Sequence, residues 1–333
     1  LLNIAFGKVE NLNSEDSILD ELFYGEDFGC DVCFETFIKN VNPYGFIFIE
    51  YHFKKKYDTK LLKEQLTQLL GRDVPFFIDQ EGGSVNRLKH LYPDEYFPPA
   101  SELGKLAEKD LFLAVGKTYN LGLHIGNILS NIAFDVNLAP NAEVNPIDTK
   151  GFFKSRAYSD NPKIVHILSN AFALGLKDGG IEPCFKHFPG TGQSQVDPHK
   201  AFAVIEDLTL YDLEQRDLIP FEHANNYKYI MVGHAYYPEI DKENLSTYSP
   251  KIYQILRDDY NFEGFILTDA LNMNASGKRF TLGTKMRLAL EAGADIALPF
   301  FPHDMSFAKQ QKELNKIPKY MIKNFNKKLA QNI

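Results

Sequence analysis

Eight short apolar runs recur along the chain, and longer segments with helical periodicity separate most of them. The runs lie at 2–7, 45–50, 74–80, 133–140, 183–188, 229–234, 264–270 and 294–299. They are almost continuously apolar and rich in Phe and Ile, which is typical of strands buried on both faces of a parallel sheet. Eight strands alternating with helices predict a single-domain (β/α)8 barrel of the TIM type over residues 1–333.

The intervening segments carry apolar residues at helical spacing. In 60–72, the residues Leu62, Leu66, Leu69 and Leu70 share one face, and Gly71 is placed to end the helix. Further helices are expected at 110–132, 161–180, 249–261 and 284–295, and from about Asp304 to the end. The alternative is an open doubly wound sheet, which is disfavoured because no Gly-x-Gly-x-x-Gly follows an early apolar run.

Composition excludes several classes of protein. The net charge of -8 argues against general nucleic-acid binding, which requires a basic surface. No apolar stretch approaches the length of a membrane span, and the first residues turn acidic too early for a signal peptide. Cys30 and Cys33 form a lone C-x-x-C without the second pair that a zinc site would need, and Cys184 lies in an apolar run. We therefore expect reduced thiols, a cytoplasmic protein and no metal or cofactor.

Charged and polar residues end several of the apolar runs. Asp79 ends the third run, Lys186 and His187 end the fifth, His234 ends the sixth, and Asp269 ends the seventh. In a barrel these positions face one basin at the carboxyl ends of the strands. Half-buried charges are costly unless they are paired, so the pattern indicates an active site. An ion-paired rim without catalytic function is the alternative.

Glycoside hydrolysis is the first chemistry that fits these residues. It uses a carboxylate on one side of the sugar, here Asp269, and a proton donor on the other. The polar, Gly-rich segment 186–200 is expected to be a loop, and it carries Asp197 two residues before His199. This spacing lets the carboxylate of Asp197 hold one imidazole nitrogen while the other remains free to donate a proton.

Metal-assisted hydrolysis is the second chemistry considered. His187, His234 and Asp269 could be ligands, with Lys186 nearby. Barrel metal hydrolases usually bring an H-x-H from the first strand, and the run at 2–7 has none. The remaining histidines are assigned no functional role: His52, His90, His124, His166, His223 and His303.

Five motifs, in this order, resemble glycoside hydrolase family 3, and specifically its single-domain bacterial β-N-acetylglucosaminidases. They are DQEGGSVNRL (79–88), NLAPNAEVN (137–145), SRAYSDNP (155–162), KHFPGTGQSQVDPHK (186–200) and GFILTDALNM (264–273). The likeness extends from about residue 42 to about residue 298. Each motif alone is weakly specific, but the ordered set is highly specific.

The resemblance implies a retaining, two-step glycosidase that acts on a small saccharide or muropeptide from peptidoglycan. In the family pattern, Asp269 matches the nucleophile, His199 the general acid/base and Asp197 its partner. The positions that match residues holding the terminal N-acetylglucosamine are Asp79, Arg87, Arg156, Lys186 and His187. No nucleic-acid or membrane partner is expected, and a monomer is expected.

The chain also departs from the family pattern. Ser84 replaces arginine, Glu143 replaces aspartate, and Thr191 replaces the histidine in the middle of the loop. Pro198 stands between the residues of the Asp-x-His pair, where it restricts the preceding backbone, and Ala270 follows the nucleophile position. Three alternatives therefore stay open: a slow or divergent hydrolase, transfer of the sugar to phosphate, and sugar binding without catalysis.

Overall fold

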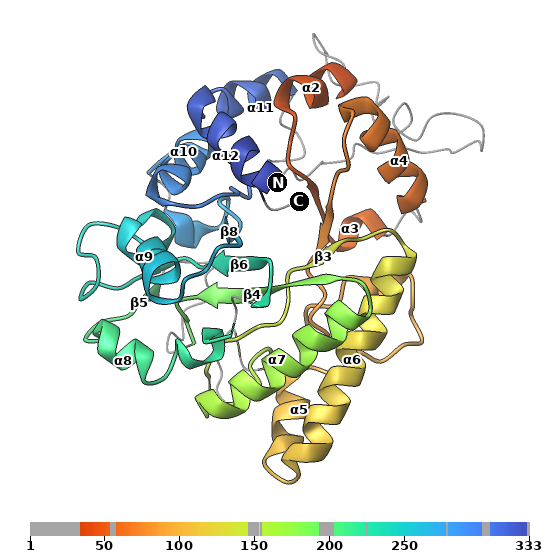
Figure 1. The fold of residues 1–333 in the computed structure, drawn as a ribbon, viewed down its shortest axis with the longest axis vertical. Helices are drawn as coiled ribbons and strands as arrows, with labels where there is room; N and C mark the ends of the chain where they lie inside the picture. The colour runs from red at the N-terminus through yellow and green to blue at the C-terminus, as the bar shows by residue number, and fades with distance from the viewer. Residues whose placement is uncertain are drawn as a thin grey trace.

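A parallel sheet forms the centre of the fold. The computed structural model describes residues 34–53, 58–145, 153, 155–192, 203–223, 226–277, 279–301 and 307–331. Within these residues six strands pair in the order β1-β2-β3-β4-β6-β8, all in parallel (Figure 1). They are β1 (Phe46–Phe48), β2 (Phe76–Ile78), β3 (Val136–Asn137), β4 (Glu182–Phe188), β6 (Tyr229–Val232) and β8 (Phe265–Thr268).

The predicted strands agree with this sheet where the structure describes them. Each apolar run from 45–50 to 264–270 contains one strand. The run at 294–299 contributes a parallel bridge to Leu267 of β8, and the run at 2–7 lies outside the described residues. No ladder within the described part of the chain joins this end of the sheet to β1. The parallel α/β architecture is confirmed, and closure into an eight-stranded barrel stays a prediction.

Side chains from all six strands meet on one face of the sheet. They form a single buried cluster of Ile47, Phe77, Val136, Leu138, Cys184, Tyr229, Met231, Phe265, Leu267, Ile296 and Leu298. The ring of Tyr44, just before β1, lies 5.7 Å from the ring of Phe265 in β8. Since β1 and β8 are the two ends of the strand order, the sheet curves around an interior that side chains fill.

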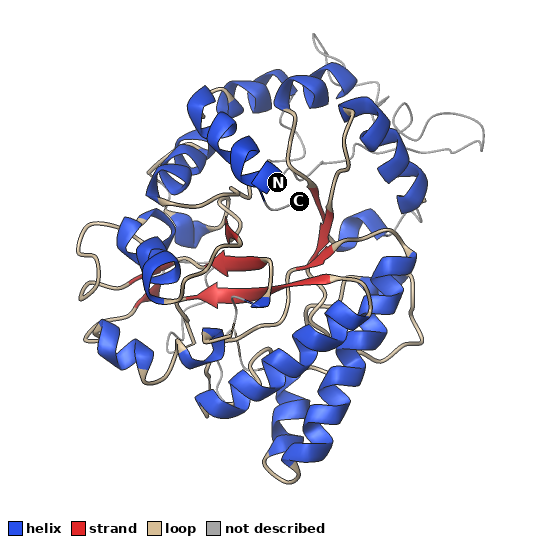
Figure 2. Cartoon of the chain, in the orientation of Figure 1, coloured by secondary structure: helices blue, strands red, loops and turns tan. Residues whose placement is uncertain are grey.

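Helices lie around the outside of the curved sheet (Figure 2). They are α2 (Phe34–Val41), α3 (Glu50–Phe53), α4 (Thr59–Leu70), α5 (Ala100–Ala107), α6 (Leu111–Asn131), α7 (Pro162–Asp178), α8 (Leu210–Glu214), α9 (Pro250–Gln254), α10 (Leu282–Ala292), α11 (Phe307–Leu314) and α12 (Lys319–Gln331). None of the described helices is both long and apolar enough to cross a bilayer.

Local sequence signals set both ends of α4, and its end at Gly71 agrees with the prediction. The Asp58 side chain accepts from the backbone N–H groups at the start of α4, and Gly71 ends this helix with φ of 66°. The helices α6 and α7 pack side by side (Figure 1). A Cβ atom at Gly122 of α6 would collide with the carbonyl oxygen of Phe172 in α7, so glycine permits this close packing.

Three local features differ from the predictions. The expected single C-terminal helix is two helices, α11 and α12, because Pro318 at the junction lacks an N–H donor and disfavours helix in the residue before it. The helix predicted at 249–261 begins as α9 and continues as a π-helical turn over Ile255–Asp259. A two-stranded parallel sheet of β5 (Ala203–Val204) and β7 (Ala235–Tyr236) was not expected, since two residues carry no detectable periodicity.

Candidate active site

A pocket of about 260 Å³ lies at the carboxyl ends of β2, β4, β6 and β8, the edge where parallel α/β sheets place their ligand sites. Its polar lining includes Asp79, Arg87, Arg156, Lys186, His187, Thr191, His234, Asp269 and Asn272. Lys186 and His187 are consecutive, yet both line the pocket. The pairing of β4 with β6 shifts register between Lys186 and Phe188, and such an irregularity redirects side chains that a regular strand would send to opposite faces.

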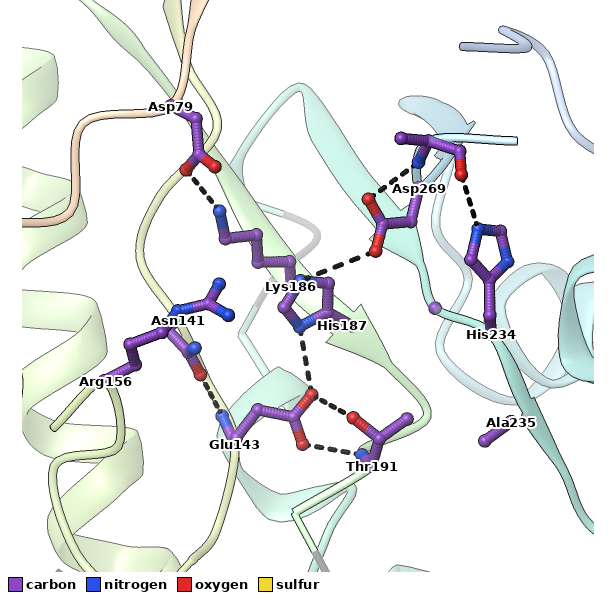
Figure 3. A network of polar contacts seen from close by, with 12 residues as sticks. Asp79, Asn141, Glu143, Arg156, Lys186, His187, Thr191, His234, Ala235 and Asp269 are labelled. Carbon is purple, nitrogen blue, oxygen red and sulfur yellow. Dashed lines mark hydrogen bonds and ion pairs between the residues drawn. The ribbon is translucent and has the colours of Figure 1, made fainter. Parts of the chain in front are cut away.

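Lys186 lies between two carboxylates. Its Nζ atom is 2.5 Å from Oδ1 of Asp79 and 2.6 Å from Oε1 of Glu81. Figure 3 draws the contact with Asp79 as a dashed line. Burial alone would lower the pKa of Lys186, but the charges of Asp79 and Glu81 outweigh it and the pKa is raised. The side chain of Lys186 is 2% exposed, so it is a buried ammonium group that stays protonated.

Glu81 also binds Arg156 through two hydrogen bonds. Arg156 Nε donates to Oε2 at 2.9 Å, and Nη2 donates to Oε1 at 2.7 Å. Burial would raise the pKa of Glu81, but Arg156 and Lys186 hold it well below its usual range. Arg87 completes the cluster, with Nη2 3.6 Å from Oδ2 of Asp79. The five groups form one network of ion pairs, and groups of this kind make strong hydrogen bonds to the hydroxyl groups of a sugar.

His187 lines the pocket and contacts the carboxylate of Glu143 behind it. Its Nδ1 atom lies 3.0 Å from Oε1 of Glu143, and its Nε2 atom lies 3.9 Å from Oδ2 of Asp269 (Figure 3). A carboxylate oxygen accepts hydrogen bonds, so the geometry of this contact assigns its proton to Nδ1 of His187. Thr191 binds the same carboxylate through its backbone N–H at 2.6 Å and its hydroxyl at 2.8 Å.

Asp269 follows β8 and lies opposite these groups. Its backbone N–H donates to Val232 of β6, and its Oδ1 accepts from the N–H of Ala270 at 2.7 Å. Burial raises the pKa of Asp269, but electrostatic interactions with His187 and His234, the hydrogen bond from the Ala270 N–H and the interaction with Lys186 together bring it below its ordinary value. Asp269 is therefore an ionised carboxylate facing a pocket, which is the state that a nucleophile or charge stabiliser requires.

His234 supports the segment that carries Asp269. Its Nε2 donates to the carbonyl oxygen of Ala270 at 3.0 Å, and its Nδ1 contacts the hydroxyl of Thr247. Burial lowers the pKa of His234, so the ring is neutral at neutral pH. Both ring nitrogens are engaged, which leaves none to bind a metal. Among the residues described, no group of three or more His, Cys, Asp or Glu side chains is arranged to hold a metal ion.

The structure brings together every predicted site residue that it describes. Asp79, Arg87, Arg156, Lys186, His187 and Asp269 line one pocket. Asp197 and His199, together with Pro198, lie outside the described residues, and so do Cys30 and Cys33. Cys184 is a buried free thiol, as predicted. Of the histidines assigned no functional role, His90 and His124 contact the carboxylates of Glu50 and Glu95.

Two carboxylates of the site were not among the predicted site residues. Glu81 stands two positions after Asp79, and its burial between Lys186 and Arg156 depends on contacts across the fold. Glu143 was noted only as a departure from the family pattern. The sequence does carry a signal for Glu143. It is a charged residue shortly after the apolar run at 133–140, and the same position relative to a strand pointed to Asp79 and Asp269.

Comparisons with known proteins agree with this arrangement. A family model described as the glycosyl hydrolase family 3 N-terminal domain matches residues 37–330. The chain is 29% identical over 252 residues to a beta-hexosaminidase of Nitrosomonas eutropha, covering 74% of this chain and 71% of the relative. It is 30% identical over 228 residues to a beta-hexosaminidase of Stenotrophomonas maltophilia, covering 68% of this chain and 66% of the relative.

A solved structure shares the fold. NagZ from Neisseria gonorrhoeae, determined in complex with zinc ion, superposes with a TM-score of 0.65 at 25% identity, over 81% of this chain and 82% of that one. The family match covers most of the chain and includes all the described residues of the pocket. The chain belongs to the glycosyl hydrolase family 3 N-terminal domain family and is a glycoside hydrolase.

Proposed function

We propose that this enzyme is an exo-acting β-N-acetylglucosaminidase that removes terminal non-reducing N-acetylglucosamine from peptidoglycan fragments. The observation that carries the proposal is the ionised carboxylate of Asp269 facing the network of Lys186, Arg156 and Asp79 across one small pocket. The names of the relatives support the sugar. Peptidoglycan as the source and the cytoplasm as the compartment follow from the family resemblance alone.

The proposed reaction is a double displacement. An oxygen of Asp269 attacks the anomeric carbon and forms a glycosyl-enzyme ester, while His199 donates its proton to the departing glycosidic oxygen. His199 then takes a proton from water, and the resulting hydroxide equivalent attacks the same carbon and releases Asp269. Two inversions give net retention. Asp197 holds the imidazole of His199 in this scheme.

The polar network positions the sugar for this attack. Asp79 and the cations Lys186, Arg87 and Arg156 are placed to bind ring hydroxyl groups, which fixes the anomeric carbon relative to Asp269. His187 Nε2 points into the same space, close to Asp269. These interactions add binding free energy that can help to distort the ring toward the transition state.

The first test is release of nitrophenol from 4-nitrophenyl N-acetyl-β-glucosaminide beside the matching β-glucoside, with wild type and Asp269→Ala. Release from the first substrate alone, lost in the variant, supports the proposal. A folded protein that cleaves neither substrate contradicts it and supports the binding-only alternative. Adding phosphate distinguishes phosphorolysis, which would yield a sugar phosphate. Proton NMR of the first product formed should show the β-anomer, and an α-anomer would exclude retention.

A further inference from the structure

Glu143 carries a fully buried carboxylate, and within the described residues its side-chain hydrogen bonds go to two residues that line the pocket, Thr191 and His187. Its side chain is 0% exposed. It accepts hydrogen bonds from the N–H and hydroxyl of Thr191 and from Nδ1 of His187. Burying a carboxylate is costly unless it is hydrogen bonded or paired. No Lys or Arg in the described ranges forms an ion pair with Glu143, so within these ranges His187 is the residue that pairs with its carboxylate.

The three donors use both oxygens of the carboxylate. The backbone N–H of Thr191 binds Oε2, while the Thr191 hydroxyl and His187 Nδ1 share Oε1. Thr191 therefore fixes the orientation of the carboxylate, and the carboxylate in turn fixes the ring of His187. A ring contact with Phe153, at 5.8 Å between centroids, packs against the imidazole as well.

The orientation of His187 decides what its other nitrogen does. With the proton held at Nδ1 by Glu143, the neutral ring presents Nε2 as an acceptor, and the charged ring presents it as a donor. Nε2 faces the pocket 3.9 Å from Asp269 (Figure 3). Within the described residues, His187 interacts with the titratable groups of Glu143, Asp269 and His234, which follow three different strands.

We propose that Glu143 is a positioning residue that, held by Thr191, fixes the Nδ1–H form and the orientation of His187 so that Nε2 serves the sugar and Asp269. The effect on catalysis rests on the proposed function. The effect on the imidazole does not, because it is a property of the resting protein. The two parts can therefore fail separately.

The test is a Glu143→Gln variant, observed by NMR of protein labelled with ¹⁵N at histidine. Gln has the same shape, but its terminal amide keeps one acceptor oxygen and replaces the other oxygen with an NH2 group, which cannot accept from Thr191 or His187. We expect the His187 signals, assigned by their loss in His187→Gln, to change from the Nδ1–H form to the Nε2–H form at neutral pH. We also expect kcat/KM to fall roughly 10–100-fold, as for loss of a hydrogen bond to a charged group.

The matched control is Asp241→Asn, which alters another buried carboxylate held by backbone and side-chain donors at a different site. It should leave the His187 signals unchanged. Unchanged His187 signals in Glu143→Gln would overturn the proposal, whatever the activity. If Glu143→Gln does not fold, Thr191→Val decides, because it removes only the hydroxyl.

Two substitutions at Thr191 give this milder test. Thr191→Val should perturb the His187 signals and lower kcat/KM, and Thr191→Ser, which keeps the hydroxyl, should leave both close to wild type. The proposal would be overturned if Thr191→Val left the His187 signals unchanged, or if Thr191→Val and Thr191→Ser changed them equally. Wild-type protein that gives the expected Nδ1–H signal but releases no N-acetylglucosamine would contradict the proposed function and leave the positioning role of Glu143 intact.

Discussion

The Nε2 atom of His187 lies 3.9 Å from Oδ2 of Asp269, too far for a hydrogen bond but close enough for a strong electrostatic interaction. Burial opposes ionisation of Asp269, and His187 is the largest of the influences that favour it. The ionisation of the proposed nucleophile therefore depends on a residue from a different strand.

His187→Gln should move the acid limb of the pH profile. In wild type the lowered pKa of Asp269 keeps the carboxylate charged, so activity should persist until the pH falls below about 3.9, the ordinary Asp value. Removing the imidazole removes the largest influence that lowers the pKa of Asp269, while burial still raises it. The pKa of Asp269 should therefore rise, and the acid limb of kcat/KM should move up by about one pH unit or more. His124→Gln, beside Glu95 at the surface, is the control. A limb that does not move would show that His187 does not set this ionisation.

Glu81→Gln should destabilise the protein. The substitution leaves Arg156 and Lys186 buried with one carboxylate fewer, and breaking a buried pair costs about 3 kcal/mol or more. Glu291→Gln removes an exposed pair with Arg287 and should change the free energy of unfolding by about 0.5 kcal/mol or less. Urea denaturation of both variants measures the difference, and equal small effects would contradict the prediction.

The effect of Glu81→Gln on the free energy of unfolding should also depend on pH. The pKa of Glu81 is depressed, so its contribution is present above the ordinary Glu pKa of about 4.3 and is lost as the pH falls toward the folded-state value. The difference in unfolding free energy between wild type and Glu81→Gln should therefore be largest at neutral pH and shrink below about pH 4. A difference that grows on acidification would have the wrong sign.

Two departures from the family pattern, Glu143 and Thr191, contact each other and should compensate. Shortening Glu143 to Asp withdraws the carboxylate by about 1.5 Å and breaks its contacts with Thr191. We expect Glu143→Asp and Thr191→His each to lower kcat/KM about tenfold, and the double variant, which restores the usual family pair, to recover part of the loss. Additive losses in this double-mutant cycle would show that the two positions are not coupled.

Chelators should leave the activity unchanged. Both ring nitrogens of His234 are engaged by Thr247 and Ala270, and Nδ1 of His187 is held by Glu143. The proposed mechanism uses carboxylate and imidazole groups throughout. Assaying 4-nitrophenyl N-acetyl-β-glucosaminide hydrolysis after dialysis against EDTA measures this. Activity that disappears and returns on adding a divalent ion would revive the metal-hydrolase alternative.

The sequence alone predicted the elements and most of the pocket. Apolar runs and helical spacing depend on residues close together in the chain, so they located β1, β2, β3, β4, β6 and β8 of the central sheet, and α4 with its Gly71 terminus. The rule that polar residues end buried strands selected Asp79, Lys186 and Asp269, which the structure places in one pocket. The roles of Asp197 and His199 stay predictions, because these residues lie outside the described part of the chain.

Only the tertiary structure decided which of these charges are partners. Glu81 and Arg156 are 75 positions apart in the chain, and Glu143 and Thr191 are 48 apart. Their pairing depends on the curvature of the sheet and on the register shift in β4, which no local periodicity encodes. Local spacing determines which side chains can reach the strand ends. Long-range packing determines the distances between them, and those distances set the ionisation of Asp269 and the orientation of His187.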